Sequence, residues 1–126
     1  MPKYYFYNAA LVRGDEGIRF ENIVASALLK ACHHQVDVEG LTAGLHYLRD
    51  KSGHEIDFLT QVDDQLCMIE VKNKQANISK HFSVFAKQLP NARQVQLVNH
   101  LTEERSNSAG VAVKKAENWL QDMPLG

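Results

Sequence analysis

The chain has 126 residues, of which 44% are hydrophobic and 23% are charged, and its formal net charge is −1. That length is enough for one hydrophobic core and short for two, and the composition is typical of a globular chain rather than a disordered one. A net charge near zero excludes nucleic-acid binding through overall charge, so any basic surface must be local. We therefore expect a single domain over residues 1–126, with residues 1–13 as an N-terminal arm or strand.

The sequence shows no sign of secretion or membrane insertion. The first residues, MPKYYFYNAALVRG, lack the sustained apolar run and the small-residue cleavage site of a signal peptide. No run approaches the ~18 apolar residues that would span a bilayer. Cys32 and Cys67 lie in apolar runs without metal-type spacing, which predicts buried free thiols. These features favour a soluble, cytoplasmic protein with no membrane association.

The first half of the chain predicts an arm, a helix and a meander of strands. KYYFYNAALV is rich in aromatic residues and predicts a strand or an extended arm. From Ile18 to about Cys32 the apolar residues recur with a helical period. The apolar stripe predicted for this helix consists of Phe20, Ile23, Val24, Ala27, Leu28 and Ala31. Short alternating runs then predict strands over 44–50, 54–62 and 66–72.

The second half of the chain returns to helical periodicity and then alternates. Residues 77–89 predict a helix that Pro90 ends, and residues 92–100 predict a strand. A loop, a short strand over 111–113 and a terminal helix over 114–123 follow, with Trp119 and Leu120 as the anchors of the last helix. This order predicts an α/β fold in which helices flank a mixed sheet.

Acidic residues and a lysine alternate within HEIDFLTQVDDQLCMIEVKNK, residues 54–74. Residues two apart on a strand share a face, so Asp57 on one strand could converge with Glu70 and Lys72 on the next. Two carboxylates and a main-chain carbonyl, here that of Val71, are oxygen ligands that Mg²⁺ accepts. An ammonium group beside them can assist a bound water in phosphodiester hydrolysis. The plainer alternative is the solvated face of an ordinary hairpin, which shows the same alternation.

Other residues could contribute to such a site. Glu21 lies on the flank of the first helix's apolar stripe and could complete the ligand set. No acidic residue occurs between Glu70 and Glu103, and this interval is basic. Three of its lysines could hold DNA phosphates, or could simply form a solvated helix face: Lys74, Lys80 and Lys87. Gln88 is a further candidate polar residue, whereas the histidines lack ligand spacing and predict structural or surface positions.

The motif SGHEIDF, followed after a loop by IEVKNK, resembles the PD-(D/E)XK nuclease pattern, which has an Asp on one strand and Glu-x-Lys on the next. Nearly the whole chain is similar to the nuclease-like C-terminal domain, of unknown function, of a large family of prokaryotic AAA-type ATPases. GIRFENIVASALL resembles its first helix, LHYLRDKSGHEIDFL its signature and GVAVKKAENWL its closing segment. The chain departs from the family pattern at Asn8, Ala10 and Leu48, where Asp, Gly and Trp are usual.

The resemblance implies a restriction-endonuclease-like fold with Asp57, Glu70 and Lys72 in the nuclease core and Glu21 as the first-helix acid. It also implies Mg²⁺ or Mn²⁺ as the cofactor and DNA as the partner. Glu55 is a signature residue of the family, and its role would be either a second metal carboxylate or a partner for an arginine on the neighbouring strand, Arg49.

Three functions remain open on this resemblance: a metal-dependent nuclease domain, which we favour, a non-catalytic binding or regulatory module with the same fold, and a structural remnant. The sequence has no Gly-x-x-x-x-Gly-Lys-Ser/Thr motif, so the ATPase module is absent from this chain. We expect either an excised fragment or a free-standing remnant. The aromatic arm around Tyr4 to Tyr7 would then present an apolar edge that invites homodimerisation.

Overall fold

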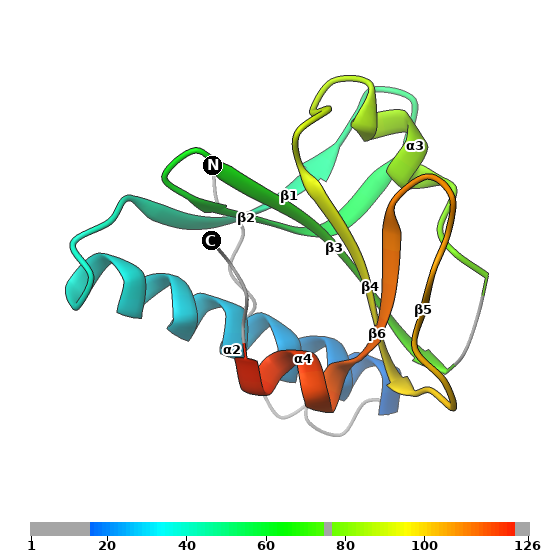
Figure 1. Ribbon diagram of the computed structural model, residues 1–126, viewed down its shortest axis with the longest axis horizontal. Helices are drawn as coiled ribbons and strands as arrows, with labels where there is room; N and C mark the ends of the chain where they lie inside the picture. The colour runs from blue at the N-terminus through cyan, green and yellow to red at the C-terminus, as the bar shows by residue number, and fades with distance from the viewer. Residues whose placement is uncertain (1–15, 75–76, 123–126) are drawn as a thin grey trace.

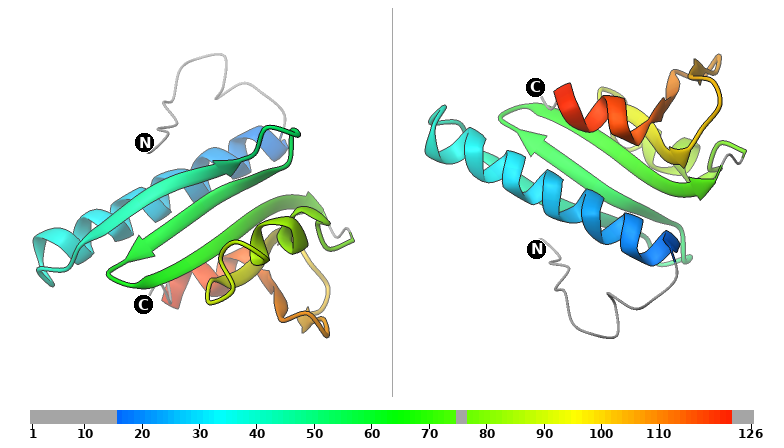
Figure 2. Two further views of the ribbon diagram at one scale, coloured as in Figure 1. Left: turned by 90° about the horizontal axis from the view of Figure 1, so that it is seen from above. Right: turned by 90° about the horizontal axis from the view of Figure 1, so that it is seen from below.

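The computed structural model describes residues 16–74 and 77–122, so the N-terminal arm lies outside the described residues. Within these ranges the chain forms a mixed six-stranded sheet with helices on both faces (Figures 1 and 2), which confirms the predicted α/β class. The helices are α2 (Glu16–Asp37), α3 (His81–Ala86) and α4 (Ala116–Asp122). The strands are β1 (Ala43–Arg49), β2 (Glu55–Val62), β3 (Gln65–Lys74), β4 (Arg93–His100), β5 (Arg105–Ser106) and β6 (Val111–Lys115).

The strand order in the sheet is β1-β2-β3-β4-β6-β5. The first three strands form the predicted antiparallel meander. β3, β4 and β6 run parallel to one another, and β5 pairs antiparallel with β6. The parallel neighbours β3 and β4 need a crossover, and α3 lies within that connection.

Short polar turns explain why the meander forms locally. In the β1–β2 turn the Asp50 carboxylate accepts the N–H groups of Ser52 and His54, both at 2.9 Å. Gly53 has φ of 90°, which glycine adopts without the strain that a side chain would impose. The β2–β3 turn is only two residues long, and its Asp63 takes the left-handed conformation with φ of 51°.

The helices divide the core between the two faces of the sheet. α2 and α4 cover one face, and α3 covers the other (Figure 2). On the first face Trp119 of α4 is buried with Leu28 of α2 against β-strand residues, and Leu120 packs beside them, which confirms both predicted anchors. On the second face Phe82 and Phe85 of α3 pack against the sheet. Among the described residues, no helix is both long and apolar enough to cross a membrane.

Helix α2 differs from its prediction in length and in the face that it buries. It continues past Cys32 to Asp37 and ends at a cap, in which Gly40 has φ of 69° and the Leu41 N–H donates to the Gln35 carbonyl at 2.9 Å. The residues of α2 that face the sheet recur about one helical turn apart. Ile23 lies outside this stripe, and 57% of its surface is exposed. The buried residues of the helix are Phe20, Asn22, Val24, Ala25, Leu28 and Cys32.

Helix α3 is much shorter than the predicted span 77–89, because the residues before it are bound by another strand. The Ser79 N–H donates to Gln96 Oε1 at 2.9 Å, and Gln96 Nε2 donates to the Asn77 carbonyl at 3.2 Å. These bonds hold residues 77–79 against β4 and outside the helix. At the other end of the chain β6 extends to Lys115, so α4 begins at Ala116 rather than at residue 114, and the short strand β5 was not predicted.

Strand β2 is irregular at Asp57. Regular alternation along the strand would place Ile56 and Phe58 on one face, but Ile56 packs in the α3-side core and Phe58 in the α2-side core. The β1–β2 register shifts between His46 and Leu48, and the β2–β3 ladder ends at the pair Phe58↔Ile69. A shift of this kind redirects side chains, and here it turns the strand at the position of the predicted acidic residue.

Candidate functional site

Two predicted carboxylates meet where β2 and β3 stop pairing. The Asp57 N–H donates to Glu70 Oε1 at 2.8 Å, and the Val71 N–H donates to Asp57 Oδ2 at 2.9 Å. Because the ladder ends at Phe58↔Ile69, these carboxylates accept amide hydrogens just beyond the last ladder pair. Each strand therefore holds the carboxylate of the other, and we call Asp57 and Glu70 the reciprocal pair.

Burial makes ionisation of the reciprocal pair unfavourable. Glu70 is only 5% exposed. Burial raises the pKa of Glu70 to about 7, the charge of Asp57 adds to the rise, and the Asp57 amide, Lys72 and the Ser79 hydroxyl oppose it. Burial also raises the pKa of Asp57, opposed chiefly by the amide of Val71. Two carboxylates that disfavour each other's charge form a site that favours a proton or a cation.

Lys72 provides the positive charge nearest to Glu70 in the described structure. Its Nζ lies 4.0 Å from Glu70 Oε2, and its side chain is 38% exposed. Residues two apart on a strand share a face, so Glu70 and Lys72 both project to the side that α3 covers, as does buried Met68. The predicted triad of two carboxylates and a lysine is therefore together on one face.

The remaining predicted ligands are placed differently. Glu21 is half-buried on α2, the helix that covers the other face of the sheet. Over residues 16–74 and 77–122 no group of three or more His, Cys, Asp or Glu side chains could hold a metal ion, so Glu21 does not join the reciprocal pair in such a cluster. The N–H group of Val71 donates to Asp57. The group of this residue that the sequence predicted as a metal ligand is its main-chain carbonyl.

One of the two roles predicted for Glu55 was to pair with Arg49, and the structure contains this ion pair. Glu55 Oε1 lies 3.3 Å from Nε of Arg49, the residue opposite it in the β1–β2 register. Both side chains are more than half exposed, so this ion pair contributes little to the free energy of unfolding. The negative charge of Glu55 nevertheless adds to the raised pKa of Asp57, so it influences the site from the rim.

The three candidate phosphate-binding lysines are exposed, but they are spread along the α3 side. Lys74 ends β3, Lys80 directly precedes α3, and Lys87 directly follows it. Gln88 lines a pocket with Asp64 and Leu66 at the β2–β3 turn, the end of β3 opposite to Lys74. The structure therefore places Gln88 away from the reciprocal pair.

Sequence reasoning missed three residues that the structure brings to the site. Gln96 is fully buried and lies opposite Glu70 in the β3–β4 register. Ser79 and His81 reach the same region from the start of α3. A glutamine within the apolar strand RQVQLVNH was the one available signal, because the contacts of Ser79 and His81 depend on the path of the crossover.

Two histidines that sequence spacing set aside also meet here. His81 Nδ1 lies 2.6 Å from the Glu55 carbonyl oxygen, and the ring is near enough to Asp57 to lower the pKa of that carboxyl. The rings of His54 and His81 meet edge to face with their centroids 5.5 Å apart. Nδ1 of His54 lies 2.7 Å from Oδ2 of Asp50. The histidines thus border the site from two different elements.

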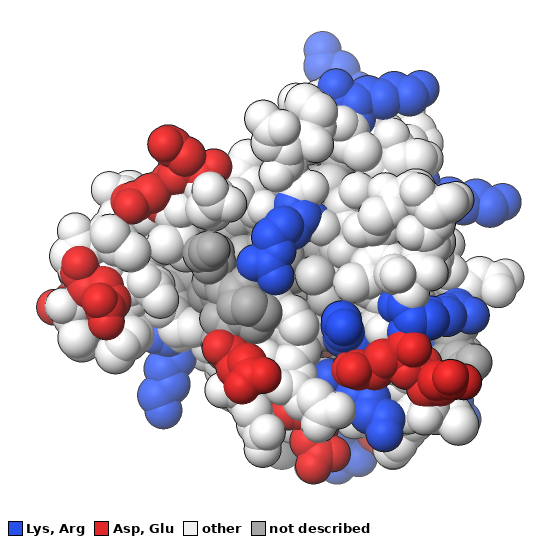
Figure 3. Space-filling model, viewed as in Figure 1, with Lys and Arg blue, Asp and Glu red and all other residues white. Residues whose placement is uncertain are grey.

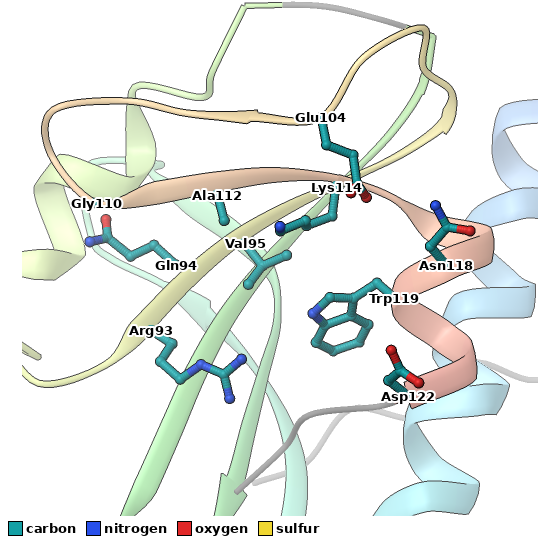
Figure 4. A pocket seen from close by; sticks show the side chains of 10 residues that line it. All are labelled: Arg93, Gln94, Val95, Glu104, Gly110, Ala112, Lys114, Asn118, Trp119 and Asp122. Carbon is teal, nitrogen blue, oxygen red and sulfur yellow. The ribbon is translucent and has the colours of Figure 1, made fainter.

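A separate cavity of about 380 Å³ lies among β4, β6 and α4 (Figure 4). Trp119 and Asp122 enter it from α4, and Arg93 enters it from β4. Its lining residues are Arg93, Gln94, Val95, Glu104, Gly110, Ala112, Lys114, Asn118, Trp119 and Asp122. The cavity carries cationic and anionic groups together and contains none of the predicted site residues, so the candidate site remains the reciprocal pair.

A protein-family model matches most of the chain. The family model described as "Domain of unknown function (DUF4143)" matches residues 16–118, which include α2, the whole sheet and every described candidate residue of the site. A search of curated proteins finds no match.

Proposed function

Because the chain belongs to the DUF4143 family, whose function is unknown, we propose an activity from the site itself: divalent-metal-dependent hydrolysis of DNA phosphodiesters by a PD-(D/E)XK-type domain. The observation that carries the proposal is the reciprocal pair of buried carboxylates with Lys72 Nζ 4.0 Å from Glu70.

The donor set suits a hard divalent cation. The cross-strand amides engage Oε1 of Glu70 and Oδ2 of Asp57, so the second oxygen of each carboxylate would be the ligand atom. The main-chain carbonyl of Val71 and water would complete the coordination, as Mg²⁺ and Mn²⁺ accept. When bound, the ion would supply an acidified water and would neutralise negative charge at the phosphate. It would also offset the burial and the repulsion from Asp57 that together raise the pKa of Glu70.

The protein's own groups would orient the substrate and stabilise its developing charge. The Lys72 ammonium would donate to a phosphate oxygen, and this stabilisation is strong in a site that excludes water. The lysines nearest to the start of α3 and the end of β3, Lys80 and Lys74, would hold neighbouring phosphates. Glu21 remains a candidate for indirect support of the site from α2.

A non-catalytic binding or regulatory module is the second candidate. The observation that favours it is that the reciprocal pair is largely shielded from solvent and has few ligands to offer. Glu70 is 5% exposed, and among the described residues no third acidic, histidine or cysteine ligand joins the pair. In that case the reciprocal pair would fasten β2 to β3, and the lysines would bind a polyanion without cleaving it.

Metal binding and cleavage separate the two candidates. For the nuclease, Mn²⁺ should raise the Tm of the wild type, and this shift should disappear in Glu70→Gln, because only ligands of the folded state couple metal binding to stability. Cleavage of single-stranded, duplex and branched DNA with Mg²⁺ or Mn²⁺ should be lost in Glu70→Gln and in Lys72→Ala. The control is Glu117→Gln, which changes an exposed carboxylate on α4.

The result that would contradict the nuclease is cleavage that persists unchanged in Glu70→Gln and Lys72→Ala. DNA binding by the wild type without any metal-dependent cleavage would favour the binding module.

A further inference from the structure

A second cavity, of about 480 Å³, lies on the α3 side of the sheet, between α3 and the strands β4 and β6. Figure 1 shows the β5–β6 hairpin beside α3, and the connection between those two strands lines the far side of the cavity. The apolar part of the lining consists of Ile78, Phe82, Ala86 and Val111. A cavity of this size, with apolar walls and a few polar groups, has the usual form of a site for a small organic group.

The cavity lies near the reciprocal pair on the same face of the sheet. Gln94, which lines it, stands two residues before Gln96 on β4, so the two side chains share a face. Figure 4 shows the Gln94 side chain pointing away from Trp119, which belongs to the other face. Gln96 is opposite Glu70 in the β3–β4 register. From the spacing of strands and the rise along them, the backbones of Gln94 and Glu70 are about 8 Å apart. A DNA strand bound at the reciprocal pair would therefore reach the cavity within a few nucleotides.

Two amide side chains of the cavity are each held at one end. Gln94 Nε2 donates to the Ala109 carbonyl at 3.5 Å. Asn107 Oδ1 accepts the N–H groups of Ala109 at 3.1 Å and of Val111 at 2.8 Å. Within residues 16–74 and 77–122 no hydrogen bond occupies the other ends, Gln94 Oε1 and Asn107 Nδ2. The cavity thus offers one acceptor and one donor, and a hydrogen bond already orients each amide.

These groups match the chemistry of a nucleobase. A base has flat apolar faces and an edge that carries donors and acceptors, and the amides of Asn and Gln are common partners for such an edge. Lys80 also lines the cavity, its side chain is exposed, and no salt bridge engages it in the described part of the chain. Its ammonium group would suit the phosphate of the same nucleotide.

We propose that this cavity receives one unpaired base of the DNA strand that the reciprocal pair would cleave, with Gln94 and Asn107 on the edge of the base and Lys80 on its phosphate. The inference rests on the function proposed above, and it makes the substrate class DNA with an unpaired base near the cleaved bond. In a duplex, pairing occupies the edge of a base and stacking occupies its faces, so a base enters such a cavity only when it is unpaired or flipped out.

The test compares two short DNA strands of equal length and equal phosphate charge. One consists entirely of abasic units, and the other carries a single adenine at its centre. Fluorescence anisotropy of the labelled strands, in EDTA to prevent cleavage, measures the Kd of each for the full chain. The wild type should bind the adenine strand about 10- to 100-fold more tightly than the abasic strand, as expected for one well-placed base contact.

Two variants remove the proposed partners of the base. Gln94→Met removes the acceptor at a similar side-chain length. Asn107→Asp keeps the oxygen that accepts two main-chain N–H groups and removes the donor. Each variant should lower the ratio of the two Kd values by about 5-fold. The ratio is the readout because the negative charge of Asn107→Asp weakens the binding of both strands alike.

The chain offers a matched control for these variants. Gln88 is an exposed glutamine that lines a different pocket, so Gln88→Met should keep the ratio of the wild type. Lys80→Ala should weaken the binding of both strands and also keep the ratio, because it removes a phosphate contact and leaves the contacts to the base.

The outcomes separate this inference from the proposed function. A wild-type ratio near 1 overturns the base site, as does a ratio that Gln94→Met and Asn107→Asp leave unchanged. In either case metal-dependent cleavage that Glu70→Gln abolishes would still support the nuclease. Binding of neither strand also overturns the base site. If free dAMP binds as tightly as the adenine strand, the assignment to a DNA strand is wrong, because the cavity would then be a site for a free nucleotide.

Discussion

The Glu70 carboxylate sits where its ionised form is disfavoured in the folded state. Its pKa is raised from the ordinary value of 4.5 to about 7, first by burial and then by Asp57, so over this interval the folded chain retains a proton that the unfolded chain releases. The stability that Glu70 contributes is therefore fully present below pH 4.5 and is lost as the pH rises to about 7. The raised pKa of Asp57 acts in the same direction, and the two groups titrate as a pair.

This linkage predicts that raising the pH destabilises the metal-free protein through Glu70, and that Glu70→Gln removes most of the effect. The glutamine keeps an oxygen for the Asp57 amide and carries no charge. Between pH 5 and pH 8 the wild type should lose on the order of 2 to 3 kcal/mol of unfolding free energy relative to Glu70→Gln, at about 1.4 kcal/mol for each unit of pKa shift. Urea unfolding at the two pH values measures the difference.

The exposed carboxylate of Glu117 again provides the control, and Glu117→Gln should follow the wild type at both pH values. If the unfolding free energies of the wild type and Glu70→Gln changed with pH in parallel, the folded state would not raise the pKa of Glu70 as described.

At the scale of elements, α2 holds one face of the sheet through a narrow stripe. Leu28 is 0% exposed in the core, and Ile23 on the same helix is 57% exposed. Truncation of a buried leucine loses the transfer free energy of its methyl groups and leaves a cavity. Truncation of an exposed residue changes little. Truncation of each of these two residues therefore tests which face of α2 is buried.

Leu28→Ala should lower the unfolding free energy by about 2 to 5 kcal/mol, and Ile23→Ala should change it by less than roughly 0.5 kcal/mol. Urea denaturation of both variants at one pH makes the comparison. Equal losses would mean that the apolar stripe predicted from periodicity, which included Ile23, describes the buried face better than the structure does.

The meander was predictable because its signals are local. The strands from residue 43 to residue 74 follow alternation and turn residues that lie within a few positions of one another. The start of α3 was not predictable in this way, because the bond between Ser79 and Gln96 joins residues 17 apart. The different faces of Ile56 and Phe58 escaped prediction for a similar reason: the irregularity at Asp57 is fastened by contacts with the next strand. Of the site, the sequence supplied Asp57, Glu70 and Lys72. It omitted Ser79, His81 and Gln96, whose contacts depend on the path of the crossover.

At the scale of the whole molecule, the charge is unevenly placed although the net charge is −1. On the face shown in Figure 3, lysines and arginines project from the end that carries α3, and acidic side chains lie around the far end of α2, but acidic and basic side chains also lie together near the β4–β5 connection at the lower right. The DNA that we propose as the substrate would meet the reciprocal pair from the α3 side, where phosphate contacts would provide a salt-dependent attraction.

We predict that Lys80→Ala weakens DNA binding more than Lys87→Ala does. Lys80 precedes α3 beside Ser79, which binds Gln96, the residue opposite Glu70 in the sheet, and Lys87 lies at the other end of the helix. Loss of one phosphate contact should lower the slope of log Kd against log salt by about 1. Fluorescence anisotropy with labelled DNA at several salt concentrations measures both the affinity and the slope.

The two lysines serve as controls for each other, because both are exposed and flank the same helix. Equal effects, or a larger effect at Lys87, would place the DNA away from the reciprocal pair.

The reciprocal hydrogen bonds also give the protein two spectroscopic reporters. The amide proton of Asp57 points at Glu70, and the amide proton of Val71 points at Asp57. The nitrogen-15 and proton resonances of these two amides will therefore follow the charge on the carboxylate of the facing strand. Each acid of the pair can thus be titrated through the backbone of its neighbour, without a label at the site.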